Sequence, residues 1–371
     1  MFIIYLTILI LLLVILKYYF NGPSSHISNL DNKIAIVTGS SSSIGRETAF
    51  ELVKQGCLVV FACRNESKTI KEINKLESKY KNNAVYMNLN LNSFNSIKNF
   101  CDQFKTKFNK LDFLVNNAGT IYEKFTLSED NIEATLQTNT IGPILLTDLL
   151  MDIIIHSKGK IINVSSDAHK YSNVDFKQMN YKYFIKDEIK QNTNITNKEL
   201  NETYNTSNNL INNINNEDFN WSYYVMFKQY CFSKLGNIYF TQYLDDYSYL
   251  TNKIFYSYSI HPGFIMNQNI YNLITTNLLV KVILIILFPL MLIVSKTQNK
   301  GAQTTLHCIY NSFSSLISGG YYKDCKIGSL GNIAKADQKE TRKEYILKCM
   351  ELIEKSKFGI TNNYKFNLKK L

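Results

Sequence analysis

The sequence lacks paired cysteines. None of its seven cysteines belongs to a C-x-x-C pair, and their number is odd. This pattern argues against a zinc site and against a disulfide framework, and it favours a reducing compartment. An arginine-rich run is also missing, and the lysines behind the net charge of +11 are scattered. Scattered lysine is typical of a solvated surface, so we expect no nucleic-acid partner; membrane proximity or an anionic cofactor explains the basic balance better.

Charge is missing from the apolar run Phe2–Leu16, and Lys17 follows that run. The run is about long enough to cross a bilayer if the aromatic residues up to Phe20 lie at the interface. A cleaved signal peptide is the alternative, but it needs a positive charge before the run and a small-residue cleavage site after it. The sequence has neither, so we predict a transmembrane anchor at 1–20, a linker at 21–32 and a cytosolic body.

Apolar runs then alternate with helical patterns. Continuous apolar strands separated by helices predict a parallel sheet covered on both faces, and 45% apolar residues supply a core. We therefore expect one α/β domain at 33–326, with a doubly wound, Rossmann-type parallel sheet, and a C-terminal helical tail at 327–371. The expected strands are 33–39, 57–64, 84–89, 111–119, 159–166 and 254–263; the expected helices are 44–56, 67–80, 96–108, 129–155 and 221–244.

Two segments interrupt this alternation. Residues 185–220 are rich in asparagine and have no hydrophobic period, so we predict a disordered surface insertion. Residues 277–294 are apolar, but Lys281 and Pro289 disfavour a straight spanning helix. A lid lying on the membrane and a buried core helix are both compatible with this second segment.

Five motifs follow the expected strands or open the helices after them. The first, Thr38–Gly45, has the T-G-x(5)-G spacing of a turn whose backbone amides face a pyrophosphate at a helix N-terminus. The carboxyl ends of the strands in such a sheet form the ligand-binding edge. The other motifs that fall there are Asn116–Gly119, Ser166, the pair Tyr230 and Lys234, and His261–Gly263.

With these motifs the chain resembles the short-chain dehydrogenase/reductase family, over roughly residues 33–325. It is similar in particular to the membrane-anchored retinol dehydrogenase branch. That closer resemblance rests on "IGRETA", "FACR", "YCFSKLGN", "IHPG", "KGAQTTLHC" and "SGGYYKDCK". The resemblance implies catalytic roles for Asn139, Ser166, Tyr230 and Lys234, with Asn139 holding a proton-relay water near the lysine.

The spacing of Tyr230 and Lys234 supports a proton-transfer site, because residues four apart lie one helical turn from each other. A nearby ammonium, joined by an oxidised nicotinamide, favours phenolate and is expected to lower the tyrosine pKa from about 10. Tyr230 would then exchange a proton with the substrate alcohol, while Ser166 would donate a hydrogen bond to the substrate oxygen.

NADP(H) is the expected cofactor. An NAD site places an acidic residue after the second strand, where this chain has Arg64. Arg46 and Arg64 can both contact a 2′-phosphate. Besides Tyr230 and Lys234, the expected cofactor-binding residues are Thr38, Gly39, Ser41, Ser43, Ile44, Gly45, Arg46, Arg64, Asn90, Leu91, Asn117, Ala118, Gly119, Pro262, Gly263 and Ile265.

Three positions depart from the family pattern. Ser43 stands where the family has its middle glycine, Asn90 replaces an aspartate near the adenine, and Asn267 replaces a hydroxyl residue. These changes leave open the alternative that the chain is a non-catalytic NADP-binding membrane protein.

The main hypothesis is an NADP(H)-dependent oxidoreductase that interconverts a lipophilic alcohol and its aldehyde or ketone, as a retinol dehydrogenase or retinal reductase does. The same chemistry on a sterol, a sphingoid base or a fatty acyl ketone is the alternative. We expect the protein at the endoplasmic reticulum membrane, with the bilayer and a lipophilic small molecule as partners and oligomerisation left open.

Overall fold

The computed structural model describes residues 5, 13–18, 20–25, 28–179, 223–265, 288, 291–334 and 338–370. The predicted insertion at 185–220 and Asn267 lie outside these residues, as do most of the predicted anchor and most of the apolar segment 277–294. Within the described ranges, no helix is both long enough and apolar enough to cross a bilayer.

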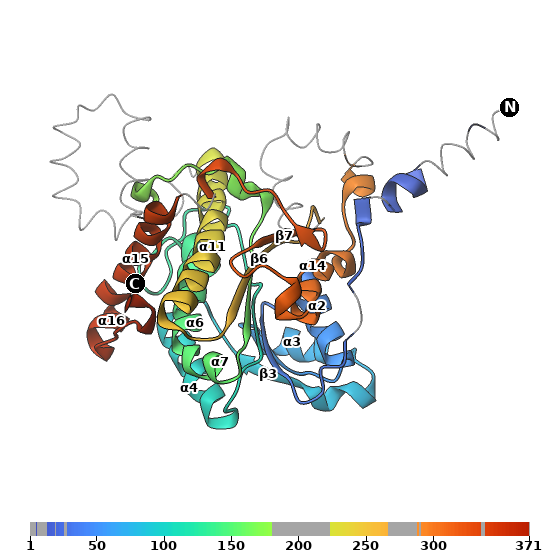
Figure 1. Cartoon of the computed structure of the whole chain (residues 1–371), viewed down its shortest axis with the longest axis horizontal. Coiled ribbons are helices and arrows are strands. Elements are labelled where there is room, and N and C mark those ends of the chain that lie inside the picture. The colour runs from blue at the N-terminus through green and yellow to red at the C-terminus, as the bar shows by residue number, and fades with distance from the viewer. Residues whose placement is uncertain are drawn as a thin grey trace.

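A single eight-stranded sheet organises the domain (Figure 1), and it confirms the predicted Rossmann-type fold. Its spatial order is β3-β2-β1-β4-β5-β6-β7-β8, with all neighbours parallel except the last pair. The strands are β1 Ile34–Thr38, β2 Leu58–Cys63, β3 Ala84–Asn88, β4 Phe113–Asn116, β5 Lys160–Val164, β6 Tyr256–His261, β7 Tyr321–Lys323 and β8 Lys326–Ile327.

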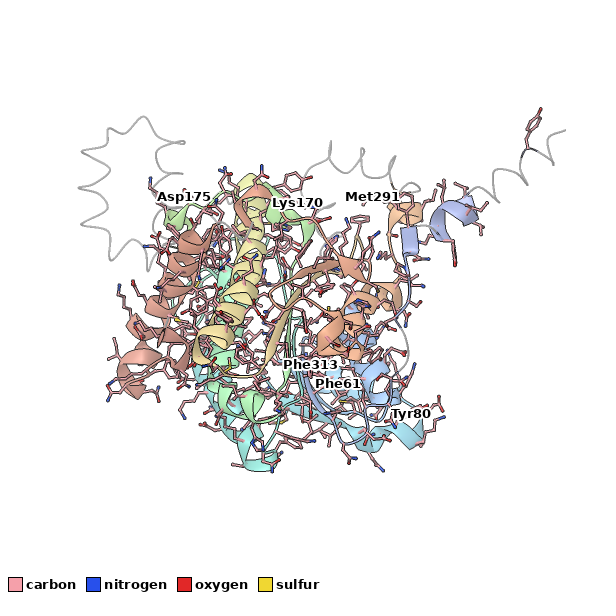
Figure 2. All side chains as sticks on the ribbon, viewed as in Figure 1. Phe61, Tyr80, Lys170, Asp175, Met291 and Phe313 are labelled. Atoms are coloured by element: carbon pink, nitrogen blue, oxygen red, sulfur yellow. The ribbon has the colours of Figure 1, made fainter. Side chains whose placement is uncertain are left out.

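Two apolar layers cover the sheet. Side chains from α2 (Ser43–Lys54), α3 (Glu66–Ile73) and α14 (Gln298–Tyr310) pack in one layer. The other layer is formed by α4 (Phe94–Lys107), α6 (Gly142–Leu149), α11 (Tyr223–Thr251) and α15 (Lys339–Lys355). Figure 2 shows the side chains filling both layers, with Phe61 of β2 in the first. The near-continuous apolar strands are therefore buried on both faces, as expected for a parallel sheet.

The structure differs from the sequence prediction in several elements. The helix expected at 129–155 is broken into α5 (Ala134–Leu136), a π-helical turn (Gln137–Ile141), α6 and α7 (Met151–His156). Such a turn carries one extra residue and is frequent at functional sites; here it contains Asn139. The helix expected at 67–80 ends at Ile73, and β7 and β8 were not predicted because their strands are only three and two residues long.

The C-terminal residues pack onto the domain. Helix α15 lies against α11, with Tyr345 and Ile346 fully buried between them. The Arg342 guanidinium bonds the Asp246 carboxylate at 2.6 Å and the Gln242 amide at 3.1 Å. Residues 327–371, predicted as a tail, thus contribute to the core beside α11.

A buried carboxylate on α6 holds the end of this segment. Asp148 is fully buried, and it accepts hydrogen bonds from the backbone N–H of Leu368 at 2.9 Å and of Asn367 at 3.3 Å. The Tyr364 phenol donates to the same carboxylate. Residues more than two hundred positions apart are joined at this point.

We expect Asp148→Ala to lower the free energy of unfolding by about 2–4 kcal/mol, because it leaves buried N–H donors without an acceptor. Chemical denaturation measures the change. Asp152→Ala is the matched control, since its side chain is 65% exposed and pairs with Lys105 at the surface. That variant should lose less than about 1 kcal/mol. Equal losses in the two variants would contradict the anchoring role of Asp148.

Candidate active site

The carboxyl end of β5 fixes the position of α11. The Val164 carbonyl accepts hydrogen bonds from Lys234 Nζ at 2.9 Å and from Asn237 Nδ2 at 3.0 Å. The Ser165 hydroxyl donates to the Lys234 carbonyl at 2.7 Å. These contacts bring Tyr230 and Lys234 to the strand end that carries Ser166.

Tyr230, Ser166 and Lys234 come together as the sequence predicts, and burial shifts the pKa values of the tyrosine and the lysine. Burial raises the pKa of Tyr230 to about 12, although a hydrogen bond with Ser166 opposes the rise. Burial also lowers the pKa of Lys234 to about 8. Desolvation disfavours the charged form of both groups in the protein alone, and the lower phenol pKa expected beside an oxidised nicotinamide stays a prediction. The Lys234 ammonium lies 5.6 Å from the centre of the Tyr230 ring.

Gly119 and Asn139 shape the space around the lysine. A Cβ at Gly119 would lie 3.1 Å from Lys234 Nζ, so a side chain there would crowd the ammonium. Asn139 is buried, and its amide nitrogen donates to the Thr120 carbonyl at 2.9 Å and to the Ser233 hydroxyl at 3.0 Å. Its side chain is thus occupied by protein partners and does not reach either cavity described below, so it positions the Thr120 loop and α11.

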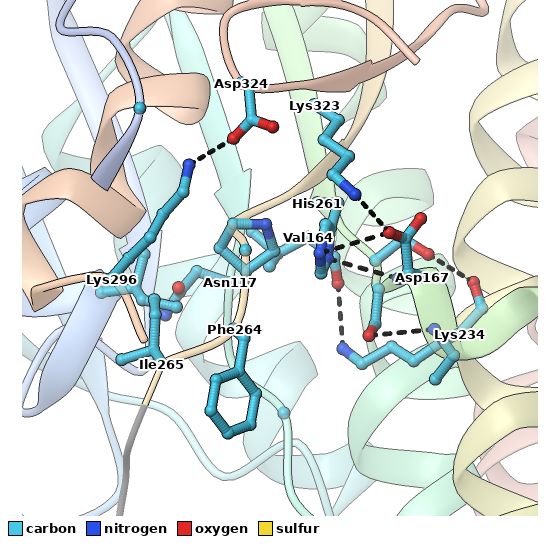
Figure 3. A pocket seen from close by; sticks show the side chains of 18 of the residues that line it. Asn117, Val164, Asp167, Lys234, His261, Phe264, Ile265, Lys296, Lys323 and Asp324 are labelled. Atoms are coloured by element: carbon cyan, nitrogen blue, oxygen red, sulfur yellow. Dashed lines mark hydrogen bonds and ion pairs between the residues drawn. The ribbon is translucent and has the colours of Figure 1, made fainter. Parts of the chain in front are cut away.

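The loop after β5 is held by charged residues that the sequence analysis did not identify. The Asp167 carboxylate pairs with Lys323 at 2.7 Å (Figure 3). It also accepts a hydrogen bond from the Tyr321 phenol at 2.9 Å. The Asp167 N–H donates to His261 Nδ1 at 3.3 Å. Burial raises the Asp167 pKa, but Lys323 and His261 outweigh it and hold the pKa below its usual range. Burial lowers the His261 pKa to about 4, so this imidazole is neutral at pH 7.

A cavity of about 770 Å³ lies over the first turn of α2. It brings together most of the expected cofactor residues, and Asn65, Lys68, Glu72 and Gln298 also line it. The expected residues found here are Gly39, Ser41, Ser43, Ile44, Gly45, Arg46, Arg64, Asn90, Leu91, Asn117, Ala118 and Gly119.

The turn fits a dinucleotide phosphate. A Cβ at Gly45 would lie 2.3 Å from Asn117 Nδ2 and 2.6 Å from the Gly39 carbonyl, so only glycine fits there. Within the described residues, the Ser43 hydroxyl is buried without a hydrogen-bond partner, and Ser42 supplies no side-chain cap to α2. Free donors at a helix N-terminus suit an anion. Ser43 also has a φ of 50°, a left-handed conformation that explains why the family uses glycine there.

Three expected cofactor residues have protein partners of their own. Thr38 is fully buried outside the cavity, and its hydroxyl accepts from the N–H groups of Asn117 and Ala118 at 3.0 and 2.9 Å. The Asn90 side chain accepts from a backbone N–H and donates to a glutamate. Arg46 pairs with Glu47 at 2.9 Å and with Glu72 at 3.3 Å.

A second cavity, of about 940 Å³, adjoins the first and shares Ile44, Asn117, Gly119 and Thr120 with it. Ser166, Tyr230 and Lys234 line it, as do Pro262, Gly263 and Ile265 from the loop after β6. Its other walls combine apolar and charged side chains. These include Ile121, Phe227, Phe264, Val294, Asp167, His261, Lys296, Lys323 and Asp324.

The left-handed backbone at Ser43 gives a stability test. Ser43→Gly should be more stable than Ser43→Ala by about 1 kcal/mol, because glycine removes the Cβ penalty and both variants remove the hydroxyl. Comparing chemical denaturation of the two variants isolates the backbone effect. Equal stability would show that Ser43 does not occupy the left-handed region.

Comparison with known proteins agrees with this geometry. The family model described as short chain dehydrogenase matches residues 33–180. Retinol dehydrogenase 12 of Bos taurus is 27% identical over 312 residues, which cover 84% of this chain and 83% of that protein. The WW domain-containing oxidoreductase of Gallus gallus is 31% identical over 314 residues, with coverage of 83% and 66%. In fold, the chain is similar to a solved protein from Mycobacterium paratuberculosis that is 18% identical, with a TM-score of 0.61 and coverage of 89% and 98%. The chain belongs to the short-chain dehydrogenase/reductase family, in its retinol dehydrogenase-like branch.

Proposed function

We propose that this oxidoreductase uses NADP(H) to interconvert a lipophilic alcohol and its aldehyde or ketone. Oxidoreduction at an alcohol or carbonyl group follows from the family. The observation that carries the proposal is the meeting of Tyr230, Ser166 and Lys234 in a cavity that adjoins the nucleotide-sized one. A nicotinamide, when bound, supplies or accepts the hydride.

Ser166, Tyr230 and Lys234 have different roles in binding the substrate oxygen and transferring its proton. Ser166 holds the substrate oxygen by donating a hydrogen bond, and Tyr230 exchanges the proton of that oxygen. Lys234 has a pKa of about 8, so it is mostly charged at neutral pH and favours the phenolate form of Tyr230. Gly119 leaves room for this ammonium at the junction of the two cavities.

The apolar walls support a lipophilic substrate. Ile121, Phe227, Phe264 and Val294 line the second cavity, whose volume of about 940 Å³ can hold a long apolar molecule. Names of the relatives support a retinoid, but the cavity walls also suit a sterol, a sphingoid base or a fatty acyl ketone.

NADP(H) is supported by the charges at the end of β2. Arg64 and Lys68 are exposed and line the nucleotide-sized cavity. The nearby Glu72 carboxylate is paired with Arg46 and Lys75. Because Arg46 already has two carboxylate partners, we assign the main contact with a 2′-phosphate to Arg64.

We also propose an endoplasmic reticulum membrane location, with the catalytic domain facing the cytosol. The uncharged run Phe2–Leu16 and Lys17 directly after it support this topology.

Tyr230→Phe tests the mechanism. We expect this variant to lose about 10²–10⁴-fold in kcat because it cannot exchange the proton, while its NADPH affinity stays unchanged. Turnover of retinal, decanal and a steroid ketone with the full chain gives kcat, and calorimetry gives the affinity. Near-wild-type turnover in Tyr230→Phe would refute the assignment. Tight NADPH binding by a wild-type protein that turns over none of the three would instead favour a non-catalytic role.

Arg64→Ala tests the cofactor assignment. We expect the Kd for NADPH to rise about 10–100-fold and the Kd for NADH to stay the same, since only NADPH carries the 2′-phosphate. Lys71→Ala is the matched control, because Lys71 is exposed on α3, the helix that follows Arg64, but does not line the cavity. A wild-type preference for NADH, or equal effects of Arg64→Ala on both cofactors, would overturn the assignment.

A further inference from the structure

The segment that follows the N-terminal apolar run lies at the second cavity. We call residues 20–25 the strap. Its residues Phe20, Gly22 and Pro23 line the cavity that also holds Ser166 and Tyr230. Figure 1 shows this N-terminal segment beside α14 and the residues before it, although the two are far apart in the sequence.

Hydrogen bonds attach the strap to α14. They involve both backbone and side-chain atoms of the strap, so they hold its main chain as well as its side chains in place. The bonds run from the Thr297 N–H to Asn21 Oδ1 at 3.2 Å, from Lys300 Nζ to Ser24 Oγ at 2.7 Å, and from the Ser25 N–H and hydroxyl to Gln303 Oε1 at 2.9 and 2.8 Å.

Lys17, just before the strap, adds a second attachment. Its ammonium donates to the carbonyls of Leu292 at 2.6 Å and of Ser295 at 2.5 Å. Met291, labelled in Figure 2, lies in the same short helical stretch as Leu292. The strap is therefore held on both sides, before Phe20 and after Pro23.

Lys296 connects the strap to the loop after β6, which carries Gly263. A Cβ at Gly22 would lie 3.1 Å from Lys296 Nζ, and a Cβ at Gly263 would lie 2.7 Å from Lys296 Cδ. The lysine is buried, and its ammonium pairs with Asp324 (Figure 3). Both glycines have a left-handed φ, of 70° and 93°. The lysine thus packs against the strap and against the loop after β6 at once.

We propose that the strap is a wall of the active site that positions the substrate, with Phe20 and Pro23 contacting its apolar body. This inference rests on the proposed function and names further specificity-determining residues for it. The cavity volume of about 940 Å³ far exceeds the volume of a short carbonyl compound. A short substrate therefore reaches Ser166 and Tyr230 without touching the strap. A long apolar substrate needs the rest of the cavity, part of whose wall the strap supplies.

Phe20→Ala in the full-length chain tests the proposal. The KM for decanal should rise about tenfold through the loss of one aromatic contact, while kcat and the KM for propanal change less than about twofold. Tyr18→Ala is the matched control, because Tyr18 is 83% exposed and does not line the cavity, whereas Phe20 is 37% exposed. Equal KM values in the two variants, or equal shifts for decanal and propanal, would overturn the proposal.

Gln303→Ala provides a variant outside the cavity. It removes the acceptor of both Ser25 hydrogen bonds, so it should raise the KM for decanal in the same direction as Phe20→Ala. An unchanged KM would contradict the attachment of the strap through α14.

A binding measurement separates this proposal from the proposed function. Calorimetry of decanol binding to the protein saturated with NADPH needs no turnover. Weaker binding in Phe20→Ala than in Tyr18→Ala supports the strap even if the wild type proves inactive, and equal binding overturns it. Absence of decanol binding in the wild type would overturn the strap proposal alone, because turnover of retinal or a steroid ketone would still decide the proposed function.

Discussion

One backbone carbonyl sets the geometry of the site. The Val164 oxygen, at the end of β5, receives both the Lys234 ammonium and the Asn237 amide, at 2.9 and 3.0 Å. Because Val164 belongs to a central strand, the helix α11 is placed relative to the whole sheet. Tyr230, on the same helix, then forms a hydrogen bond with Ser166. The cost is a buried ammonium, and burial lowers its pKa to about 8.

The site is supported from two directions that are remote in the chain. Strand β7 sends Tyr321 and Lys323 to Asp167, which fixes the loop carrying Ser166. From the other side, the first turn of α14 contacts both halves of the crevice, since Gln298 bonds Arg46 at 2.9 Å and Thr297 bonds the strap. The nucleotide half and the substrate half therefore share one structural support.

The sequence predicted those features that depend on local patterns. Continuous apolar runs identified the strands β1 to β6, and the four-residue spacing of Tyr230 and Lys234 predicted their proximity. Features that depend on distant partners could not be predicted. Lys323 meets Asp167 across 156 positions, and the sequence around the two residues does not indicate that they pair. The π-helical turn escaped prediction for a similar reason, because tertiary packing overrides local helical preference.

The attachment of Asp148 to residues 364–368 bears on how the protein is made. Synthesis proceeds from the N-terminus, and domains generally begin to fold in that order. The carboxylate on α6 is synthesised more than two hundred residues before the N–H groups of Asn367 and Leu368 that bind it. The layer formed by α4, α6 and α11 therefore gains these contacts only after residues 364–368 have been synthesised, and until then the buried side chain of Asp148 lacks the donors that bind it in the folded protein.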